Sequence, residues 1–492
     1  MTRTGKEYIE SLNDARTVYL NGEKITKVSE HPAFAEAAKS IARLYDISGD
    51  PNNRELMTFP SPKDGRPVNW CYAIPRTKED LVRRRKAIKC WADATLGLLG
   101  RSPDHVAGFL SGFAGGADFF GRGGQQFAEN VKRFHAKARD EDLHLAYAIL
   151  HPTIDRSKPA HQQPEPNLYA SVVKERDDGM VVRGAQMLAT SAVLSNYIFV
   201  SVISPQRPGD EDYAISFVVP NNAPSLKIYP RRSYSVGVTS VFDYPLSSRL
   251  DETDSLIVFD DVFIPWEDVF VYRNIDLTFG QFNQTSAHVL GNTQAQIRFW
   301  AKIQFVVGLV KRICDLNGQS SHRDTQTFLG DLAARAATAE GLMLAAEATA
   351  SEDEFGVMRP NPEMIYANQT FQQATYPEVV IMIRGMMGGS VIELPSSVAD
   401  FSNPEVASDI NRYIRWPNAK AEERVKVLKL LWDMIGSEFG GRHLQYEMFY
   451  AAGPEVVKGR AFRAYDWAKA EKLVDQCLSA YDLDSKAVSV PQ

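Results

Sequence analysis

Arg101 and His105 stand four residues apart in GRSPDH, the segment that spans residues 100–105. A guanidinium pairs with a carboxylate through two parallel hydrogen bonds or stabilises a phenolate, and an imidazole exchanges a proton near neutral pH. If the segment is helical, residues four apart share one face. The spacing therefore indicates a cation and a hydrogen-bonding group presented to one anionic or phenolic oxygen. The structural alternatives are an ion pair between Arg101 and Asp104, and ordinary packing or a surface hydrogen bond for His105.

Two further side chains are candidates for proton chemistry. His288, in NQTSAHVLGNTQ, is a second candidate base. Tyr147 carries a hydroxyl that both donates and accepts hydrogen bonds, and its alternative role is packing. A free phenol has a pKa of about 10, so an enzyme that needs a phenolate at neutral pH requires a base or a cation beside it.

Several motifs of other enzyme classes are absent from the sequence. It contains no G-x-x-x-x-G-K-[ST], no G-x-G-x-x-G after a strand, no G-x-S-x-G and no H-E-x-x-H. Nucleotide hydrolysis and a dinucleotide site that would bind NAD(P)H therefore lose support. The glycine pair in GMMGGSVIELPSS is by itself a turn between helices rather than a phosphate site.

The cysteines and the charge exclude other classes. The four cysteines are scattered at positions 71, 90, 314 and 477, so neither a disulfide framework nor a metal site is expected, and a reducing cytoplasm is the natural setting. The net charge is −6, and the one basic run, residues 83–86, reads as a solvated helix face, so no nucleic-acid partner is expected. No apolar stretch reaches about 18 residues, so no membrane span is expected.

Three regions must position these residues. Residues 1–149 read as a mostly helical domain that opens with a hairpin at TVYLNGEKI, because Asn-Gly favours a tight type I′ turn. Helical patterns there include HPAFAEAAKSIARLYD, TKEDLVRRRKAIKCWADATLGLL and GQQFAENVKRFHAKARDEDLHLAYAIL. Residues 150–274 contain short β-rich runs, among them a hairpin around Asp177-Asp178-Gly179. Residues 275–492 return to helix, with an apolar stripe at positions 303, 306, 307, 310 and 313 and an alanine-rich helix over 325–350, which together favour a bundle.

Seven segments, taken together, resemble the oxygenase components of the 4-hydroxyphenylacetate 3-monooxygenase family, which includes chlorophenol and nitrophenol monooxygenases. They are GKEYIESLNDAR, GRSPDH, HPTIDRSK, ATSA, FIPWEDVFVY, GGSVIELPSS and IGSEFGGRHLQYEMFY. Their order and spacing carry the resemblance, which runs from Thr4 to about Gly453. It implies an α+β, acyl-CoA-dehydrogenase-like fold: an N-terminal helical domain, a middle β domain and a C-terminal helical bundle. It also implies a homotetramer, FADH2 as co-substrate and a separate NAD(P)H:flavin reductase.

The resemblance also implies roles for the substrate-site residues. Arg101 matches an arginine that binds substrate in relatives acting on phenolic acids. Those relatives have tyrosine at the position of His105 and histidine at the position of Tyr147, so the two side-chain types look exchanged here. Chlorophenol-type relatives use a histidine near His288. We expect these four residues to be catalytic.

The resemblance also implies which residues bind the flavin. Thr153, Ile154, Asp155 and Arg156 match a flavin-contacting segment that commonly begins with glutamine, so one contact is altered at Thr153. The other matched flavin-site residues are Thr190, Ser191, Arg442 and His443. The alternatives are a salt bridge within the β domain for Arg156, and ordinary strand or turn positions for the two hydroxyl residues.

The expected reaction is ortho-hydroxylation of a small phenol, with FADH2 and O2 forming a flavin C4a-hydroperoxide that supplies an electrophilic oxygen. Ring-substituent loss is an open variant. Three rivals share the fold: an acyl-CoA-dehydrogenase-type enzyme that retains FAD, a 4-hydroxybutyryl-CoA-dehydratase-like lyase, and a catalytically silent flavin-binding protein. The lyase needs an iron–sulfur cluster held by Cys and His, which four scattered cysteines do not supply.

Overall fold

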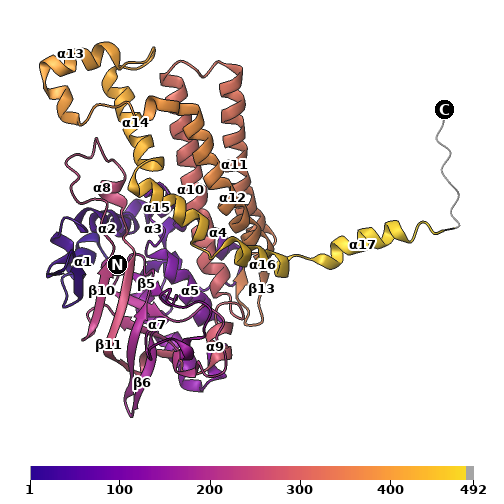
Figure 1. Ribbon diagram of the computed structural model, residues 1–492. Helices are drawn as coiled ribbons and strands as arrows, with labels where there is room; N and C mark the ends of the chain where they lie inside the picture. The colour runs from indigo at the N-terminus through magenta and orange to yellow at the C-terminus, as the bar shows by residue number, and fades with distance from the viewer. Residues whose placement is uncertain (1, 484–492) are drawn as a thin grey trace.

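The computed structural model describes residues 2–483, and the end of the C-terminal tail, from residue 484 on, lies outside the described residues. Helices of the N-terminal region lie against two β-sheets, and long helices stand beside them as a bundle (Figure 1). One continuous apolar core runs through all three parts. Among residues 2–483 no helix is long and apolar enough to cross a membrane.

The N-terminal region is mostly helical. Its helices are α1 (Gly5–Ser11), α2 (Ala35–Gly49), α3 (Arg54–Met57), α4 (Lys78–Ala94), α5 (Asp104–Gly115), α6 (Asp118–Gly121) and α7 (Gln125–Asp140). Capping boxes begin α1 and α4, where Thr4 and Thr77 accept hydrogen bonds from Glu7 and Asp80. A small two-stranded sheet pairs β3 (Thr58–Pro60) with β4 (Pro67–Asn69).

Two larger sheets form the β part. The first has the order β2-β1-β10-β11-β7-β6, and the second has the order β12-β9-β8-β5. Their strands are β1 (Thr17–Leu20), β2 (Glu23–Ile25), β5 (Leu145–Ala148), β6 (Ser171–Arg176), β7 (Gly179–Gln186), β8 (Tyr197–Val200), β9 (Ser216–Pro220), β10 (Leu226–Pro230), β11 (Ser255–Pro265) and β12 (Val269–Val271). Strands β1, β2 and β5 come from residues before 150, so the N-terminal region contributes to both sheets. The domain boundaries at 149/150 and 274/275 stay a prediction.

Both predicted hairpins are confirmed. In β1–β2, Asn21 and Gly22 have φ of 54° and 82°, the left-handed pair that a type I′ turn needs. In β6–β7, Arg176 pairs with Gly179 across Asp177-Asp178.

The C-terminal region is a bundle. Short helices α8 (Ser247–Leu250) and α9 (Ile275–Gly280) precede it, and a two-stranded ribbon, β13 (Ser351–Glu352) and β14 (Met358–Arg359), joins two of its helices. The bundle and its extension contain α10 (Ala287–Leu316), α11 (Arg323–Ala348), α12 (Pro362–Met387), α13 (Pro404–Tyr413), α14 (Ala421–Ile435), α15 (Glu438–Phe449), α16 (Pro454–Ala464) and α17 (Trp467–Leu478). The predicted apolar stripe at 303–313 lies on α10, and α17 extends away from the body (Figure 1).

One predicted helix is wrong in its second half. The pattern over residues 124–150 predicts a continuous helix, but α7 ends at Asp140 and residues 145–148 form β5. Asp142 has a left-handed φ of 50°, which breaks the helix. Strand β5 then pairs in parallel with β8, so backbone hydrogen bonds to a distant segment replace those of a further helical turn.

Helices α5 and α10 pack unusually closely because small residues face each other. A Cβ atom at Gly108 or Gly112 would lie against the backbone of α10, at Leu290 and Ala287 respectively. The two helices share more residue neighbours than any other helix pair. This contact brings the start of α5, which carries His105, against the first turns of α10, which carry His288 and Gln294.

Candidate active site

A cavity of about 920 Å³ lies where the N-terminal helices, the sheets and the bundle meet. Its lining comes from the turn before α5, from α5 and β5, from the segment after β7, from β10 and β11, and from α10, α15 and α16. Six of the residues predicted from the sequence line it: Arg101, His105, Tyr147, Thr190, His288 and Arg442.

Arg101 lies in the turn before α5 rather than on the helix that carries His105, so the predicted shared helix face is wrong. The guanidinium donates to the hydroxyl of Tyr147 at 2.8 Å and to that of Tyr446. It also lies over the rings of Tyr147, Tyr446 and Tyr450, 5.1–5.9 Å from their centroids. The turn needs a glycine at position 100, because a Cβ there would overlap the hydroxyl of Tyr446.

The charge of Arg101 has no carboxylate in contact with it within residues 2–483. The predicted alternative partner, Asp104, instead accepts hydrogen bonds from Ser102 and Gln294 at 2.5 and 3.0 Å. Although burial opposes the charge, the phenol groups of Tyr147 and Tyr446 raise the pKa of Arg101, so the cation persists. The guanidinium donates to two hydroxyls and to the backbone oxygen of Gly100, and Glu252 acts on its charge without contacting it. A buried cation with no carboxylate against its guanidinium is suited to an incoming anion.

His105 is the second residue of α5, and its proton position follows from its neighbours. Gln294 donates its amide hydrogens to Ser102 and Asp104, so its oxygen faces His105 Nδ1 at 2.9 Å. Nδ1 must then carry the hydrogen, and Nε2 is left with a free lone pair. Burial, with the charge of Arg101, holds the pKa of His105 well below its ordinary value. Nε2 is buried with no hydrogen-bond partner in the described chain, so its lone pair is free to accept a proton.

His288 lies in the first turn of α10, on another part of the cavity wall. Its Nδ1 lies 3.1 Å from the hydroxyl of Tyr366 on α12. Burial raises the pKa of Tyr366, so this hydroxyl keeps its proton. Burial, with the charge of Arg460, holds the pKa of His288 well below its usual value, so the ring is neutral.

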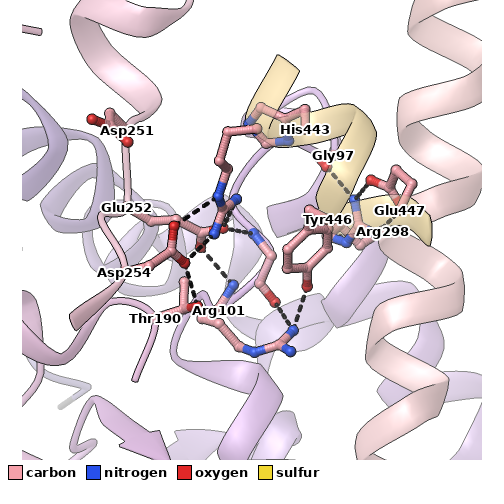
Figure 2. Close-up of polar contacts among 12 residues, drawn as sticks. Gly97, Arg101, Thr190, Asp251, Glu252, Asp254, Arg298, His443, Tyr446 and Glu447 are labelled. Carbon is pink, nitrogen blue, oxygen red and sulfur yellow. Dashed lines mark hydrogen bonds and ion pairs between the residues drawn. The ribbon is translucent and has the colours of Figure 1, made fainter. Parts of the chain in front are cut away.

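A network of charges ties α15 to the segment before β11 (Figure 2). Arg442 donates to Asp254 at 2.7 Å and to Glu252 at 2.9 Å, and Thr190 donates to Asp254 at 2.6 Å. Burial raises the pKa of Asp254, but the charge of Arg442 outweighs this and holds it well below its usual range. Glu252 also accepts from the backbone N–H of Arg101 at 2.7 Å. The charge of Arg442 is therefore already balanced, and the network fixes the turn that holds Arg101.

His443 lies behind the cavity wall in a second, fully buried network. Arg298 and Lys302 of α10 both donate to Glu447, at 2.7–2.8 Å, and Lys302 contacts His443 Nδ1 at 3.1 Å. Burial lowers the pKa of Lys302 to about 8. This network joins α10 to α15 and sits directly behind Tyr446 (Figure 2).

Other predicted cofactor residues lie at the edge of the cavity or outside its lining. Thr153, Ile154 and Arg156 are exposed and Asp155 is half-buried, on the loop after β5, where the hydroxyl of Thr153 lies 3.9 Å from the sulfur of Met187, a cavity residue. The predicted alternative, a salt bridge for Arg156, is not formed with any described residue; its guanidinium donates to Thr153. Ser191 is fully buried, and its hydroxyl has no partner among residues 2–483. A flavin contact for these residues and for His443 stays a prediction.

Sequence reasoning missed four important residues. Tyr446 on α15 and Tyr450 directly after it contact Arg101, Gln294 holds His105, and Arg460 on α16 lines the cavity. The spacing of the two tyrosines, four residues apart in HLQYEMFY, is a signal for one helix face. No local pattern marks Arg460.

The fold and the cavity define the class. Helices, then two sheets, then a bundle make up the acyl-CoA-dehydrogenase-like fold predicted from the sequence, and an archaeal 4-hydroxybutyryl-CoA dehydratase from N. maritimus shares it with a TM-score of 0.88 at 21% identity over 100% of this chain and 98% of that one. The chain belongs to the 4-hydroxyphenylacetate 3-hydroxylase family: the family's N-terminal part matches residues 4–271 and its C-terminal part matches residues 279–479.

Individual relatives cover nearly the whole chain. The 4-hydroxyphenylacetate 3-monooxygenase oxygenase component of Pseudomonas aeruginosa is 37% identical over 97% of this chain and 93% of its own length. A Streptomyces globisporus monooxygenase, named for a carrier-protein-bound 3-amino-3-(3-chloro-4-hydroxyphenyl)propanoyl substrate, is 36% identical over 98% and 92%. A crystal structure of a 4-hydroxyphenylacetate 3-monooxygenase oxygenase component with FAD and 4-hydroxyphenylacetate aligns with a TM-score of 0.92 at 32% identity, over 97% of this chain and 98% of that one.

Proposed function

We propose that this chain is the oxygenase component of a two-component, flavin-dependent monooxygenase that hydroxylates a small phenol beside its hydroxyl group, using FADH2 and O2. The observation that carries the proposal is the pairing, in one cavity, of the Arg101 guanidinium without a contacting carboxylate and the unprotonated Nε2 of His105. Membership of the family supports the same reaction.

The cavity fits a reduced flavin beside a phenol. It is large, and most of its exposed lining is apolar, which suits an aromatic ring system. Leu188 and Ile154 expose large apolar side chains at or beside the cavity, which an isoalloxazine would cover. We assign flavin binding to the loop of residues 153–156 together with Leu188, Thr190 and Arg442. When bound, the reduced flavin with O2 supplies the electrophilic oxygen.

Arg101 and Tyr147 bind the phenolic oxygen. The cation favours the phenolate over the phenol, because an opposite charge stabilises the ionised form. Tyr147 is already fixed by its 2.8 Å hydrogen bond to Arg101, so its hydroxyl needs little reorganisation to join that contact. A phenolate ring is more electron-rich at the ortho carbon than a phenol ring and attacks an electrophilic oxygen more readily.

His105 removes the phenolic proton. Its Nε2 lone pair accepts the proton and the ring becomes an imidazolium, while Nδ1–H stays bonded to Gln294. The low pKa of the free enzyme's His105 makes it a weak base in isolation. The negative phenolate that forms beside it then stabilises the imidazolium, so proton transfer and phenolate binding support each other.

A partner enzyme, an assembly state and a location complete the proposal. A separate NAD(P)H:flavin reductase delivers FADH2, in keeping with relatives named as oxygenase components. The chain assembles as a homotetramer, and it works in the cytoplasm. Tetramer and location rest on the family resemblance and on cysteine usage rather than on contacts within one chain.

The direct test supplies FADH2 from an unrelated flavin reductase, with a panel of phenols and phenolic acids, and identifies products by mass. We expect one added oxygen on the ring and no product without the reductase. NADH oxidation and hydroxylation by the chain alone would show that the two-component assignment is wrong.

A further inference from the structure

The cavity contains a second cationic side chain with no carboxylate beside it. Arg460, on α16, lines the cavity and is half-buried. It forms no ion pair with any described residue, and its one hydrogen bond is to the backbone oxygen of Ala451 at 2.6 Å. The groups that act most on its charge are the tyrosines 366, 450 and 147 and the cation Arg463, none of them an acid. Donors of this guanidinium therefore remain free for a ligand in the cavity.

His288 adds a neutral donor to the same region. The Tyr366 hydroxyl has the imidazole as its only partner in the described chain, and it keeps its proton, so it donates to Nδ1. The hydrogen of the neutral ring then lies on Nε2, the opposite assignment to that of His105. Both residues line the cavity, and the charge of Arg460 adds to burial in lowering the pKa of His288. An N–H donor and a guanidinium without an ion-pair partner in one cavity wall suit an anion.

The two cationic sites share intermediate neighbours. Tyr147 and Tyr450 both act on Arg460, and both contact the guanidinium of Arg101. One cavity is thus lined by two cations, Arg101 and Arg460, that share these two tyrosines as neighbours. The family alone does not fix what binds there, because its named substrates carry different groups opposite the phenol, from a carboxylate to a nitro group or a carrier-bound acyl group.

We propose that Arg460 and His288 form a second subsite that binds an anionic group, a carboxylate in the simplest case, on the substituent of the phenolic substrate. The inference rests on the proposed hydroxylation, and it assigns specificity to Arg460 and makes His288 a donor rather than the base. The preferred substrate is then a phenol with a negatively charged side chain. Neutral phenols of the same size bind through Arg101 alone.

The test compares three phenols of similar size: 4-hydroxyphenylacetate, uncharged 4-ethylphenol and cationic tyramine. The readout is the ratio of kcat/KM for the anion to that for 4-ethylphenol. Arg460→Gln should lower this ratio about 10- to 100-fold, the loss expected for one charge-assisted contact. Arg463→Gln is the matched control, because Arg463 is exposed on the same helix and does not line the cavity. It should keep the wild-type ratio.

A second variant distinguishes the loss of the anion subsite from a folding defect. Arg460→Glu reverses the charge and should make tyramine better than 4-hydroxyphenylacetate, which no loss of stability produces. An unchanged ratio in Arg460→Gln overturns the subsite, and so does weaker FADH2 binding with an unchanged ratio, which would place Arg460 at the flavin. If the wild-type chain hydroxylates none of the three phenols, the proposed function itself has failed.

Discussion

His105 and His288 show how one hydrogen-bond partner decides what a side chain can do. Both are buried, neutral histidines that line one cavity. Gln294 accepts from Nδ1 of His105, whereas Tyr366 donates to Nδ1 of His288. The first ring is therefore left with a free lone pair on Nε2, and the second is left with an N–H there. Sequence reasoning named both as candidate bases, because a tautomer depends on partners that are distant in the chain.

Replacing His105 by Ala should slow hydroxylation about 10²- to 10⁴-fold, the usual cost of losing a general base. Flavin oxidation would continue, so hydrogen peroxide released per FADH2 consumed should rise. Product formation and peroxide are measured together under saturating FADH2. His322→Ala, at the exposed start of α11, serves as the control and should behave as wild type. Wild-type coupling in His105→Ala would remove this residue from the mechanism.

Substrate binding should weaken if Arg101 loses either its charge or its planar guanidinium. Arg101→Ala leaves the substrate oxygen without its cation and should weaken substrate binding by roughly 2 to 5 kcal/mol. Arg101→Lys keeps the charge but loses the planar fork that spans Tyr147 and Tyr446, so we expect an intermediate loss. Substrate and FADH2 affinities are measured separately by stopped-flow. An Ala variant that loses FADH2 affinity but keeps substrate affinity contradicts the assignment.

Asp142 makes the stability of the fold depend on pH. Burial raises the pKa of its carboxyl group to about 7, and both carboxyl oxygens lack hydrogen-bond partners in residues 2–483. The unfolded chain releases this proton near pH 4, so the folded state loses stability as the pH rises from about 4 to 7. Asp142→Asn cannot ionise, and asparagine tolerates the left-handed φ of 50°. The stability difference between the variant and the wild type, measured by denaturant unfolding, should therefore grow in favour of the variant by about 3 kcal/mol from pH 4.5 to pH 8. An equal difference at both pH values would contradict this.

At the level of elements, the sequence predicts what is local. The β1–β2 hairpin follows from Asn21-Gly22, and the buried face of α10 follows from its apolar period. Strand β5 could not be predicted in the same way, because its partner β8 lies about 50 residues farther along the chain. In the candidate site, too, local sequence predicts some residues and not others. The residue types in GRSPDH mark Arg101 and His105, but Arg460 joins them only through the packing of α16.

The close contact of α5 and α10 holds the two histidines in place, and its glycines can be tested. Gly112→Ala puts a methyl group into the backbone of Ala287, and we expect a loss of roughly 1 to 3 kcal/mol in unfolding free energy together with lower activity. The matched change, Gly330→Ala on the exposed side of α11, meets open space. It should gain up to about 1 kcal/mol, because alanine favours a helix. Equal unfolding free energies of the two variants would contradict this, because they would mean that α5 and α10 can move apart without loss of stability.

At the scale of the whole molecule, α17 has an apolar face that the described residues of its own chain do not bury. It extends away from the body (Figure 1), and Trp467, Val474 and Leu478 share one of its faces by their spacing of seven and four residues. All three are about half exposed. A helix with an apolar stripe is stable only against another surface. In the proposed homotetramer, we expect that surface to belong to a second copy of this chain.

Assembly therefore should depend on this face of α17. The double variant Val474→Glu with Leu478→Glu should form smaller species than the tetramer proposed for the wild type in light scattering at micromolar concentration, because carboxylates are costly to bury without partners. The control is Lys469→Gln with Lys472→Gln, which changes the net charge by the same amount on the opposite face of the helix. A wild-type monomer would refute the tetramer, and a tetrameric double glutamate variant would remove α17 from the interface.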